Sequence, residues 1–302
     1  MKSCPLCSHS DSRPLYRTRD RSASLGPCDW LIRRCPLCRV GWTDPPPSSE
    51  QIRLAYPDGY LGDTAKTVDE FLSGRLQRSR SWKNELEKVR MVERLAPTGA
   101  ILDVGCGDGK FLWALDPKRW QRSGVEYLEE VVGIVKDRMP HLDLIPGDVW
   151  ASDLDPRRFD VITLWHVFEH LPEPQRVLER LRGLLSPQGL LLLAVPNLDS
   201  LQARWFGAGW LGLDAPRHLF HYSPQVLRGM LQESGFQIQK QMFGSSRANL
   251  HHLKHSLIHW SEDRFGSRLP YYLFKWTLFL VNWAEQLSGR YGMLVVVGRK
   301  EA

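Results

Sequence analysis

The stretch Ile101-Leu-Asp-Val-Gly-Cys-Gly-Asp-Gly109 decides the fold of this 302-residue chain. Its first four residues are typical of a buried β-strand, and the glycines that follow let the backbone turn sharply and approach a ligand closely. Residues 110–115 then continue with the spacing of a helix. A strand that runs through a glycine-rich loop into a helix is typical of nucleotide binding. The spacing G-x-G-x-G differs from the dinucleotide pattern G-x-G-x-x-G, so the neighbouring strands must indicate which nucleotide is held.

Short apolar strands alternate with helices after this loop. One helix has its apolar face between Val177 and Leu185, and Ser186-Pro-Gln-Gly189 ends it. Another helix is expected near residues 224–234. Alternation of this kind predicts an α/β fold with a parallel, doubly wound sheet. The expected strands are Ala100–Val104, Ser123–Tyr127, Leu142–Ile145, Phe159–Leu164, Leu190–Val195, Phe236–Phe243 and Met293–Gly298.

Carboxylates stand at the ends of the next two strands. Glu126 lies 17 residues beyond Gly109, where it can accept hydrogen bonds from both ribose hydroxyls of an adenosine. Asp148 and the backbone N–H of Val149 follow the third strand, beside the expected place of an adenine ring. Acidic residues at strand ends are often solvated caps. Their order on consecutive strands nevertheless predicts a nucleoside cofactor.

These residues, together with the continuous motif Phe159-Asp-Val-Ile-Thr-Leu-Trp-His-Val-Phe-Glu-His170, resemble the class I S-adenosylmethionine-dependent methyltransferases over about residues 75–300. The resemblance implies a Rossmann-like sheet of seven strands with an antiparallel last strand, and S-adenosyl-L-methionine as cofactor. An NAD-dependent dehydrogenase is the competing interpretation, and the motif at 159–170 argues against it. The resemblance implies that Asp103, Gly105, Cys106, Gly107 and Gly109 face the methionine part, Glu126 the ribose, and Asp148 with Val149 the adenine.

The N-terminus carries two cysteine pairs, Cys4-Pro-Leu-Cys7 and Cys35-Pro-Leu-Cys38. Cys4, Cys7, Cys35 and Cys38 are expected to bind a structural Zn²⁺ in a zinc-ribbon-like module, and unpaired buried cysteines are the alternative. Cys28 is expected to be a bystander. About 40 residues form too small a core to fold alone, so the metal would supply stability.

The whole chain also resembles a bacterial subgroup of these methyltransferases. In that subgroup a C-x-x-C…C-x-x-C module, a linker such as Asp44-Pro-Pro-Pro47 and a tyrosine-rich stretch such as Tyr56-Pro-Asp-Gly-Tyr60 precede the catalytic domain. Residues 1–47 would be the zinc module, 48–98 a linker and helical extension, and 99–302 the methyltransferase domain with a helical insertion at about 245–288. In the extension, Trp82, Leu86, Val89, Val92 and Leu95 recur at helical spacing, so that helix should pack against the main domain.

The composition is that of a folded protein, with 42% hydrophobic and 25% charged residues and a net charge of +6. Residues 1–40 hold eight Lys and Arg against three Asp, a local net charge of +5. Such a patch suits nucleic acid, phosphorylated substrates or acidic lipid, although a solvated face also explains it. The first residues are too polar for a signal peptide, and no apolar run approaches the ~18 residues of a membrane span. A cytoplasmic protein is therefore expected.

Candidate catalytic residues follow the fourth strand. His166, Glu169 and His170 lie at the side of the sheet where ligands bind, and His218 and His221 come later. The pattern is similar to the Glu-x-x-Glu-His…His metal site of small-RNA 2′-O-methyltransferases, and to the Glu-His pair of ubiquinone-pathway O-methyltransferases, but has His at 166 where those families carry Glu. We expect His170 and His218 to line the acceptor pocket, with one acting as base. A transition metal bound here, or a purely structural cap at Glu169-His170, is the alternative.

The insertion contains a histidine run at 251–255 and an aromatic stretch at 271–283, Tyr-Tyr-Leu-Phe-Lys-Trp-Thr-Leu-Phe-Leu-Val-Asn-Trp. The histidines are expected on an exposed helix face rather than at a metal. The aromatic stretch is too short to span a bilayer. It could lie on a membrane surface, cover the pocket of an apolar or lipid-linked acceptor, or pack inside the protein.

The leading prediction is a methyltransferase that uses S-adenosylmethionine to methylate a small-molecule, glycan or lipid-linked acceptor, with oxygen as the expected acceptor atom. An RNA methyltransferase whose basic zinc ribbon grips phosphates is the second hypothesis. Against it, residues 1–40 offer only Tyr16 and Trp30 as stacking aromatics. A cofactor-binding protein that has lost catalysis is the third.

Overall fold

The computed structural model describes residues 3–21, 25, 29–56, 61–154, 158–244 and 246–301. Cys28 and Tyr60 lie outside these residues. Seven strands form the main sheet in the order β10-β11-β8-β7-β4-β5-β6. β4 to β8 are parallel, and β11 runs antiparallel to both β8 and β10. The strands are β4 (Gly99–Val104), β5 (Trp120–Glu126), β6 (Asp143–Pro146), β7 (Phe159–Trp165), β8 (Leu185–Pro196), β10 (Phe236–Phe243) and β11 (Met293–Lys300).

This sheet confirms the predicted fold class, and the strand ends differ by a few residues. β5 begins at Trp120, three residues before the predicted start, and stops at Glu126. β8 begins at Leu185 rather than Leu190, because Leu185 pairs with Phe159 before an irregularity in the register. The helix α6 (Pro174–Leu184) does end before Ser186-Pro-Gln-Gly189, as the sequence predicted.

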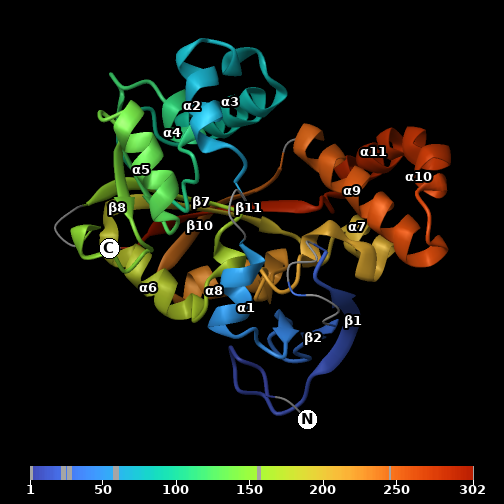
Figure 1. The fold of residues 1–302 in the computed structure, drawn as a ribbon. Coiled ribbons are helices and arrows are strands. Elements are labelled where there is room, and N and C mark those ends of the chain that lie inside the picture. The colour runs from blue at the N-terminus through green and yellow to red at the C-terminus, as the bar shows by residue number, and fades with distance from the viewer. Residues whose placement is uncertain are drawn as a thin grey trace.

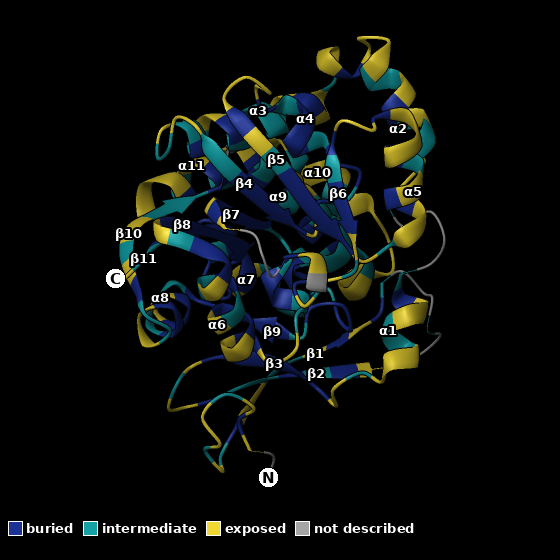
Figure 2. Ribbon diagram, turned by 90° about the vertical axis from the view of Figure 1, so that its left-hand side faces the viewer, coloured by how far each residue is buried: buried dark blue, intermediate teal, exposed yellow. Residues whose placement is uncertain are grey.

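Helices cover both faces of the sheet (Figure 1). Alternate residues of one strand point to opposite faces, so Ile101 and Leu102 belong to two different apolar clusters. One face packs against α2 (Thr64–Leu72), α3 (Arg80–Glu93), α4 (Lys110–Ala114) and α5 (Glu129–Arg138), and the other against α6 and α8 (Pro224–Glu233). Figure 2 shows the central strands buried between these layers. Because β4 to β8 are parallel, their carboxyl ends lie at the same edge of the sheet.

The helical extension packs as predicted. Ser79 caps α3 by accepting a hydrogen bond from the N–H of Trp82. Trp82, Val89 and Val92 are buried in the cluster that contains α4 and β4, with Leu86 and Leu95 half-buried beside them. Two shorter elements precede α3, namely α1 (Ser49–Ala55) and the 3₁₀ turn η1 (Leu76–Arg78).

The N-terminal strands form a second sheet with a strand from the far end of the chain. β1 (Arg13–Arg19), β2 (Asp29–Arg34) and β3 (Gly41–Asp44) pair in that order, and β9 (Phe220–His221) completes the sheet beside β3. Cys4, Cys35 and Val40 lie in the same apolar cluster as the helices α6 and α8. The N-terminal strands thus draw part of their core from the main domain.

The insertion before β11 is helical and lies beyond the edge of the sheet at which β8 and β10 end and β11 begins (Figure 1). It consists of α9 (Ser246–Phe265), α10 (Leu269–Phe274), the 3₁₀ turn η6 (Lys275–Thr277) and α11 (Leu278–Ser288). α9 also packs on α7 (Leu201–Phe206) and on the 3₁₀ turns η4 (Gly207–Gly209) and η5 (Leu211–Leu213). The remaining 3₁₀ turns are η2 (Ser152–Leu154) and η3 (Phe168–His170).

Candidate functional site

The loop between β4 and α4 holds three glycines in the left-handed region of φ, which favours glycine. Gly105, Gly107 and Gly109 have φ angles of 68°, 55° and 81°. A Cβ on Gly105 would lie 2.5 Å from Val167 Cγ2, so the loop is in direct contact with the segment that follows β7. Among the residues that the structure describes, a Cβ on Gly107 would meet only Leu61, at 3.8 Å. The open side of the loop is therefore at Gly107.

Glu126, the last residue of β5, holds this loop from the neighbouring strand. Its carboxylate accepts hydrogen bonds from the backbone N–H of Gly107 at 2.8 Å and of Leu128 at 3.1 Å. Adjacent parallel strands place the end of β5 beside the end of β4. The residue predicted to face a ribose thus also fixes the shape of the glycine loop.

Asp103 and Cys106 flank the start of the loop, and both are buried. Asp103 Oδ1 accepts a hydrogen bond of 2.6 Å from Thr163 Oγ1 on β7. Burial, only partly offset by that hydrogen bond, raises the pKa of the Asp103 carboxyl to about 7. The Cys106 thiol points into the core, where a Cβ on Gly124 would lie 2.6 Å from its sulfur. Cys106 can therefore offer a ligand only its backbone.

Asp148 follows β6 at the rim of an open pocket of about 400 Å³. Its Oδ1 accepts the backbone N–H of Trp150 at 2.8 Å. Val149 is 1% exposed and belongs to the core, so its side chain faces away from the pocket. The pocket is lined by Tyr127, Ile145, Pro146, Gly147, Asp148, Trp150, Ala151 and Asp153.

His166, Glu169 and His170 follow β7 on the side of Gly105. His166 has a φ of 60°, and Val167 packs on the glycine loop. The Glu169 carboxylate is 1% exposed, and neither oxygen has a hydrogen-bond partner among the described residues. His166 Nδ1 and His218 Nε2 lie 3.5 and 3.9 Å from its Oε1. Burial favours the neutral acid, but these imidazoles and His170 outweigh it and hold the pKa of Glu169 below its usual range.

Backbone carbonyls orient the two imidazoles beside Glu169. His170 Nδ1 lies 2.9 Å from the carbonyl oxygen of Arg217, and His218 Nδ1 lies 2.9 Å from that of Gly212. Because a carbonyl oxygen only accepts, each Nδ1 carries a proton in the neutral ring and each Nε2 keeps its lone pair. Burial and the neighbouring His218 lower the pKa of His170 to about 4. In its neutral form each ring therefore presents an unprotonated Nε2.

Glu169, His170 and His218 each place one ligand atom within 4.8 Å of the other two. A buried carboxylate that accepts no hydrogen bond from the described residues, beside two imidazoles, is a donor set that a transition metal can take. The same arrangement can accept a proton from a bound acceptor. His221, the other predicted histidine, lies apart: its Nε2 is 3.3 Å from Thr43 Oγ1, and its ring centroid is 6.4 Å from that of His218.

Three neighbours of this cluster were not predicted as site residues. The Tyr56 hydroxyl lies 3.0 Å from His170 Nδ1, although the sequence marked Tyr56 only as part of a tyrosine-rich linker. Asp214 Oδ2 lies 3.9 Å from His218 Nε2 and accepts a hydrogen bond of 2.9 Å from Arg217. The ring of His252 on α9 lies 6.0 Å from that of His166. These three residues lie far from β7 in the sequence, so no local spacing could relate them to the site. Only His252 stood out in the sequence, as part of the histidine run at 251–255.

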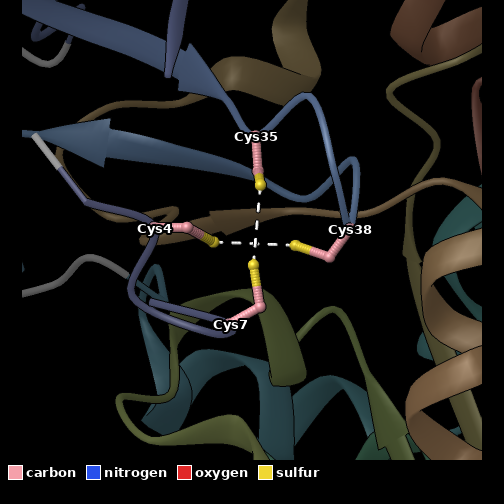
Figure 3. A group of neighbouring side chains, drawn as sticks. All are labelled: Cys4, Cys7, Cys35 and Cys38. Atoms are coloured by element: carbon pink, nitrogen blue, oxygen red, sulfur yellow. Dashed lines mark hydrogen bonds between the residues drawn. The ribbon is translucent and has the colours of Figure 1, made fainter. Parts of the chain in front are cut away.

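The four predicted cysteines converge on one point (Figure 3). Cys4 Sγ and Cys38 Sγ are 3.6 Å apart, and so are Cys7 Sγ and Cys35 Sγ. A disulfide would require about 2.05 Å. Four sulfurs around Zn²⁺, with Zn–S bonds of about 2.3 Å in a tetrahedron, would lie about 3.8 Å apart. The spacing of the thiols therefore fits a tetrahedral metal.

Comparison with known proteins finds similarity to methyltransferases. The profile of a family described as a methyltransferase domain matches residues 75–241. A probable S-adenosylmethionine-dependent methyltransferase of Mycolicibacterium smegmatis is 24% identical over 188 residues, which cover 61% of this chain and 70% of that protein. The ubiquinone biosynthesis O-methyltransferase of Coxiella burnetii is 32% identical over 101 residues, or 32% of this chain and 43% of that protein.

Among solved structures, the 4+2 cyclase SpnF superposes with a TM-score of 0.54 and 18% identity, over 85% of this chain and 97% of that one. This likeness concerns the fold alone. The family profile covers more than half of the chain and contains the glycine loop, Glu126, Asp148 and the segment after β7. The chain belongs to the methyltransferase-domain family.

Proposed function

We propose that the protein transfers a methyl group from S-adenosylmethionine to a small-molecule, glycan or lipid-linked acceptor, with oxygen as the acceptor atom. The main support for this proposal is the contact between Gly105 and Val167. It brings the cluster of Glu169, His170 and His218 directly beside the glycine loop. S-adenosylmethionine is the cofactor of the family, and it supplies an electrophilic methyl group on a sulfonium. An acceptor bound between the glycine loop and these three ionisable side chains would meet the methyl group on one side and polar groups on the other. This arrangement suits methyl transfer to a polar acceptor.

The residues at the strand ends fit this cofactor. In our proposal Asp103 and the open side of Gly107 face the methionine part, and Glu126 faces the ribose. The pocket beside Asp148 has the flat rings of Tyr127 and Trp150 exposed in its lining, by 76% and 47%, which suits an adenine ring. The cofactor would be contacted by the backbone atoms of Gly105, Cys106, Gly109 and Val149, not by their side chains.

For a hydroxyl acceptor we assign the base to His170 or His218. Both can present an unprotonated Nε2, and Glu169 can stabilise the imidazolium that forms when one of them takes the proton. Positioning can supply about 7–11 kcal/mol of the barrier, and a general base typically adds a factor of about 10²–10⁴. In this proposal His166 and Glu169 are positioning residues. They act on the reaction by orienting His170 and His218 rather than by touching the acceptor.

The central test is calorimetry with S-adenosylmethionine and its demethylated product, followed by transfer of a labelled methyl group to a cell extract fractionated into RNA, glycan, lipid and small-molecule pools. We expect both cofactor forms to bind and label to enter one of the last three pools. Absence of binding would overturn the cofactor assignment. Binding without label in any pool would favour the non-catalytic interpretation.

The roles of His170 and His218 are tested by His170→Ala and His218→Ala, with His255→Ala, at a half-buried position of α9, as the matched control. We expect turnover of at least one of the first two to fall about 10²-fold or more while the affinity for the cofactor stays within about threefold. Near-wild-type turnover in both would contradict the assignment of the base. The control is expected to keep wild-type turnover.

A metal at Glu169, His170 and His218 is the competing chemistry for the same residues. We propose separately that the four cysteines hold a structural Zn²⁺. The metal content of the purified chain distinguishes the cases, because the cysteine site alone gives about one ion per chain. A second ion per chain that is lost in Glu169→Gln would show that Glu169 helps to bind a metal. Metal-assisted methyl transfer would then replace general-base catalysis as the proposed mechanism.

The RNA hypothesis loses support from the contacts of the N-terminal sheet. Arg33 pairs with Asp44, Arg34 with Asp199 and Arg21 with Asp263, so much of the local positive charge is matched within the chain. Trp30 is 2% exposed and cannot stack on a base. RNA binding that weakens steeply with salt, together with label in the RNA pool, would restore this hypothesis.

A further inference from the structure

Exposed apolar side chains gather at one place on the molecule, the end of the helical insertion. Ten of the sixteen large apolar side chains that are exposed in the described part of the chain fall between residues 265 and 287. We call residues 265–287 the helical tip. Monomeric proteins rarely leave so many large apolar groups together in water. These ten are Phe265, Leu269, Tyr272, Leu273, Phe274, Trp276, Phe279, Leu280, Trp283 and Leu287.

The helix α11 has its polar face inward and its apolar face outward. Its buried residues are Leu278, Asn282 and Glu285, whereas Phe279 and Trp283 are 64% and 60% exposed. A helix that packs on a protein core and faces water shows the opposite arrangement. The outer face of α11 is therefore suited to an apolar environment.

Buried hydrogen bonds hold this arrangement in place. Glu285 accepts hydrogen bonds from the Gln202 side chain at 3.0 Å and from Asn249 at 2.6 Å, and Asn249 also donates to Asn282 at 2.9 Å. Leu253 and Leu257 on α9 pack against Leu278 in a small core. The helices are thus anchored to one another and to α7, and their exposed face is a fixed surface.

The charges of the tip have one sign on its surface. Within residues 265–287 the basic residues are Arg268 and Lys275, and the single acid, Glu285, is 0% exposed. Arg268 pairs with Glu262, just outside this range. Lys275 Nζ lies 5.8 and 5.1 Å from the ring centroids of Tyr272 and Trp276. Aromatic rings interleaved with cations match the boundary between acyl chains and anionic headgroups.

We propose that the helical tip docks on the surface of an anionic lipid bilayer. None of the helices within the described ranges is long and apolar enough to cross a membrane, so the tip lies in the interface. Its Trp and Tyr rings sit at headgroup depth, Phe and Leu reach the acyl boundary, and the cations meet lipid phosphates. Figure 1 shows α10 and α11 at the right-hand extreme of the molecule, away from β7 and β8, so these strands do not stand between the tip and a flat surface.

Docking would hold the candidate site at a set height above the bilayer. α9 is one continuous helix, and His252 near its start lies beside His166. From His252 to Phe265 the helix rises about 20 Å, at about 1.5 Å per residue. Membrane docking does not rest on methyl transfer, but combined with it would favour an acceptor at the membrane surface, such as a lipid-linked sugar.

The test is flotation of the full chain with vesicles of phosphatidylcholine, with and without 30% phosphatidylglycerol (about one lipid in three, a usual anionic fraction). We expect binding to the anionic vesicles that weakens at high salt. The double variant Trp276→Ser/Phe279→Ser should lower the bound-to-free ratio at least tenfold with an unchanged melting temperature. The matched control is Leu72→Ser, whose side chain is 58% exposed on α2 and which should float as the wild type does.

Two outcomes overturn the proposal. The first is a wild-type chain that fails to float with anionic vesicles. The second is a wild-type dimer in analytical ultracentrifugation without lipid that becomes monomeric in Trp276→Ser/Phe279→Ser, because a second copy would then cover the tip. Both assays are run without S-adenosylmethionine, so either result leaves the test of methyl transfer intact.

Discussion

The carboxylate of Glu126 accepts a hydrogen bond of 2.8 Å from the backbone N–H of Gly107, across the gap between the ends of β5 and β4. One side chain thus shapes the glycine loop and stands at the place where a cofactor ribose is proposed. Loss of this carboxylate should therefore weaken cofactor binding in two ways.

We expect Glu126→Ala to raise the Kd for S-adenosylmethionine by about 10- to 100-fold, since a hydrogen bond to a charged group contributes about 1.5–3 kcal/mol. Glu126→Gln should lie between this variant and the wild type, because it keeps an acceptor for Gly107. Calorimetry measures all three. Glu130→Ala, an exposed carboxylate on α5, is the control, and an equal loss there would show that general surface charge is responsible.

The raised pKa of Asp103 leads us to expect that the affinity for the cofactor depends on pH. Burial raises the pKa of this carboxyl to about 7, so it is partly protonated at neutral pH. A cationic methionine part would favour the carboxylate and lower the pKa, so binding should release a proton and tighten as pH rises from about 6 to 8. Calorimetry in two buffers of different ionisation enthalpy measures this release. A wild-type signal in Asp103→Asn would exclude Asp103 as its source.

Removal of one cysteine should affect both stability and turnover. If the cysteines hold Zn²⁺ as proposed, Cys38→Ser is expected to abolish its binding and to lower the melting temperature by several degrees, because the thiol cluster closes the N-terminal strands. Turnover should fall as well, since Thr43 Oγ1 on β3 donates a hydrogen bond of 2.7 Å to the carbonyl oxygen of His218. Metal analysis, thermal melting and methyl transfer test the three parts. Cys28→Ser is the control and should keep its metal.

Buried histidines should make the fold sensitive to acid. Burial lowers the pKa of His221 to about 3 and that of His252 to about 3, against a usual value of 6.5. The unfolded chain therefore binds more protons below pH 6.5, and stability present above that pH is lost as pH falls toward 3. Each such histidine contributes up to about 1.4 kcal/mol per pH unit. Urea unfolding between pH 7.5 and 5.5 should show this slope.

His221→Asn should remove part of the slope, whereas His141→Asn, at an exposed position, should leave it unchanged. An unchanged slope in His221→Asn would mean that His221 titrates alike in the folded and unfolded chain. A variant too unstable to unfold in a measurable transition would be replaced by His252→Asn, which probes the same effect on α9.

The features that could be predicted are those set by residues close together in the chain. The sheet, its antiparallel β11 and the glycine loop follow from apolar runs and from glycines that need a left-handed φ, and both signals lie within a few residues. Each C-x-x-C turn brings two thiols together, and the presence of two such turns predicted that both pairs meet at one metal; the contacts between Cys4 and Cys38 and between Cys7 and Cys35 depend on how the N-terminal strands fold. The start of β8 was missed, since its pairing with Phe159 involves a distant strand.

The sequence by itself therefore determined the family, the strand ends that carry Asp103, Glu126 and Asp148, and the histidines that are candidates for chemistry. The tertiary structure alone decided that Tyr56 meets His170, that the buried Glu169 lies beside His166 and His218, and that the aromatic residues of the helical tip face outward. The physical reason is that burial and contact between segments more than 40 residues apart depend on how whole elements pack. A residue's type and its neighbours in the chain do not carry that information.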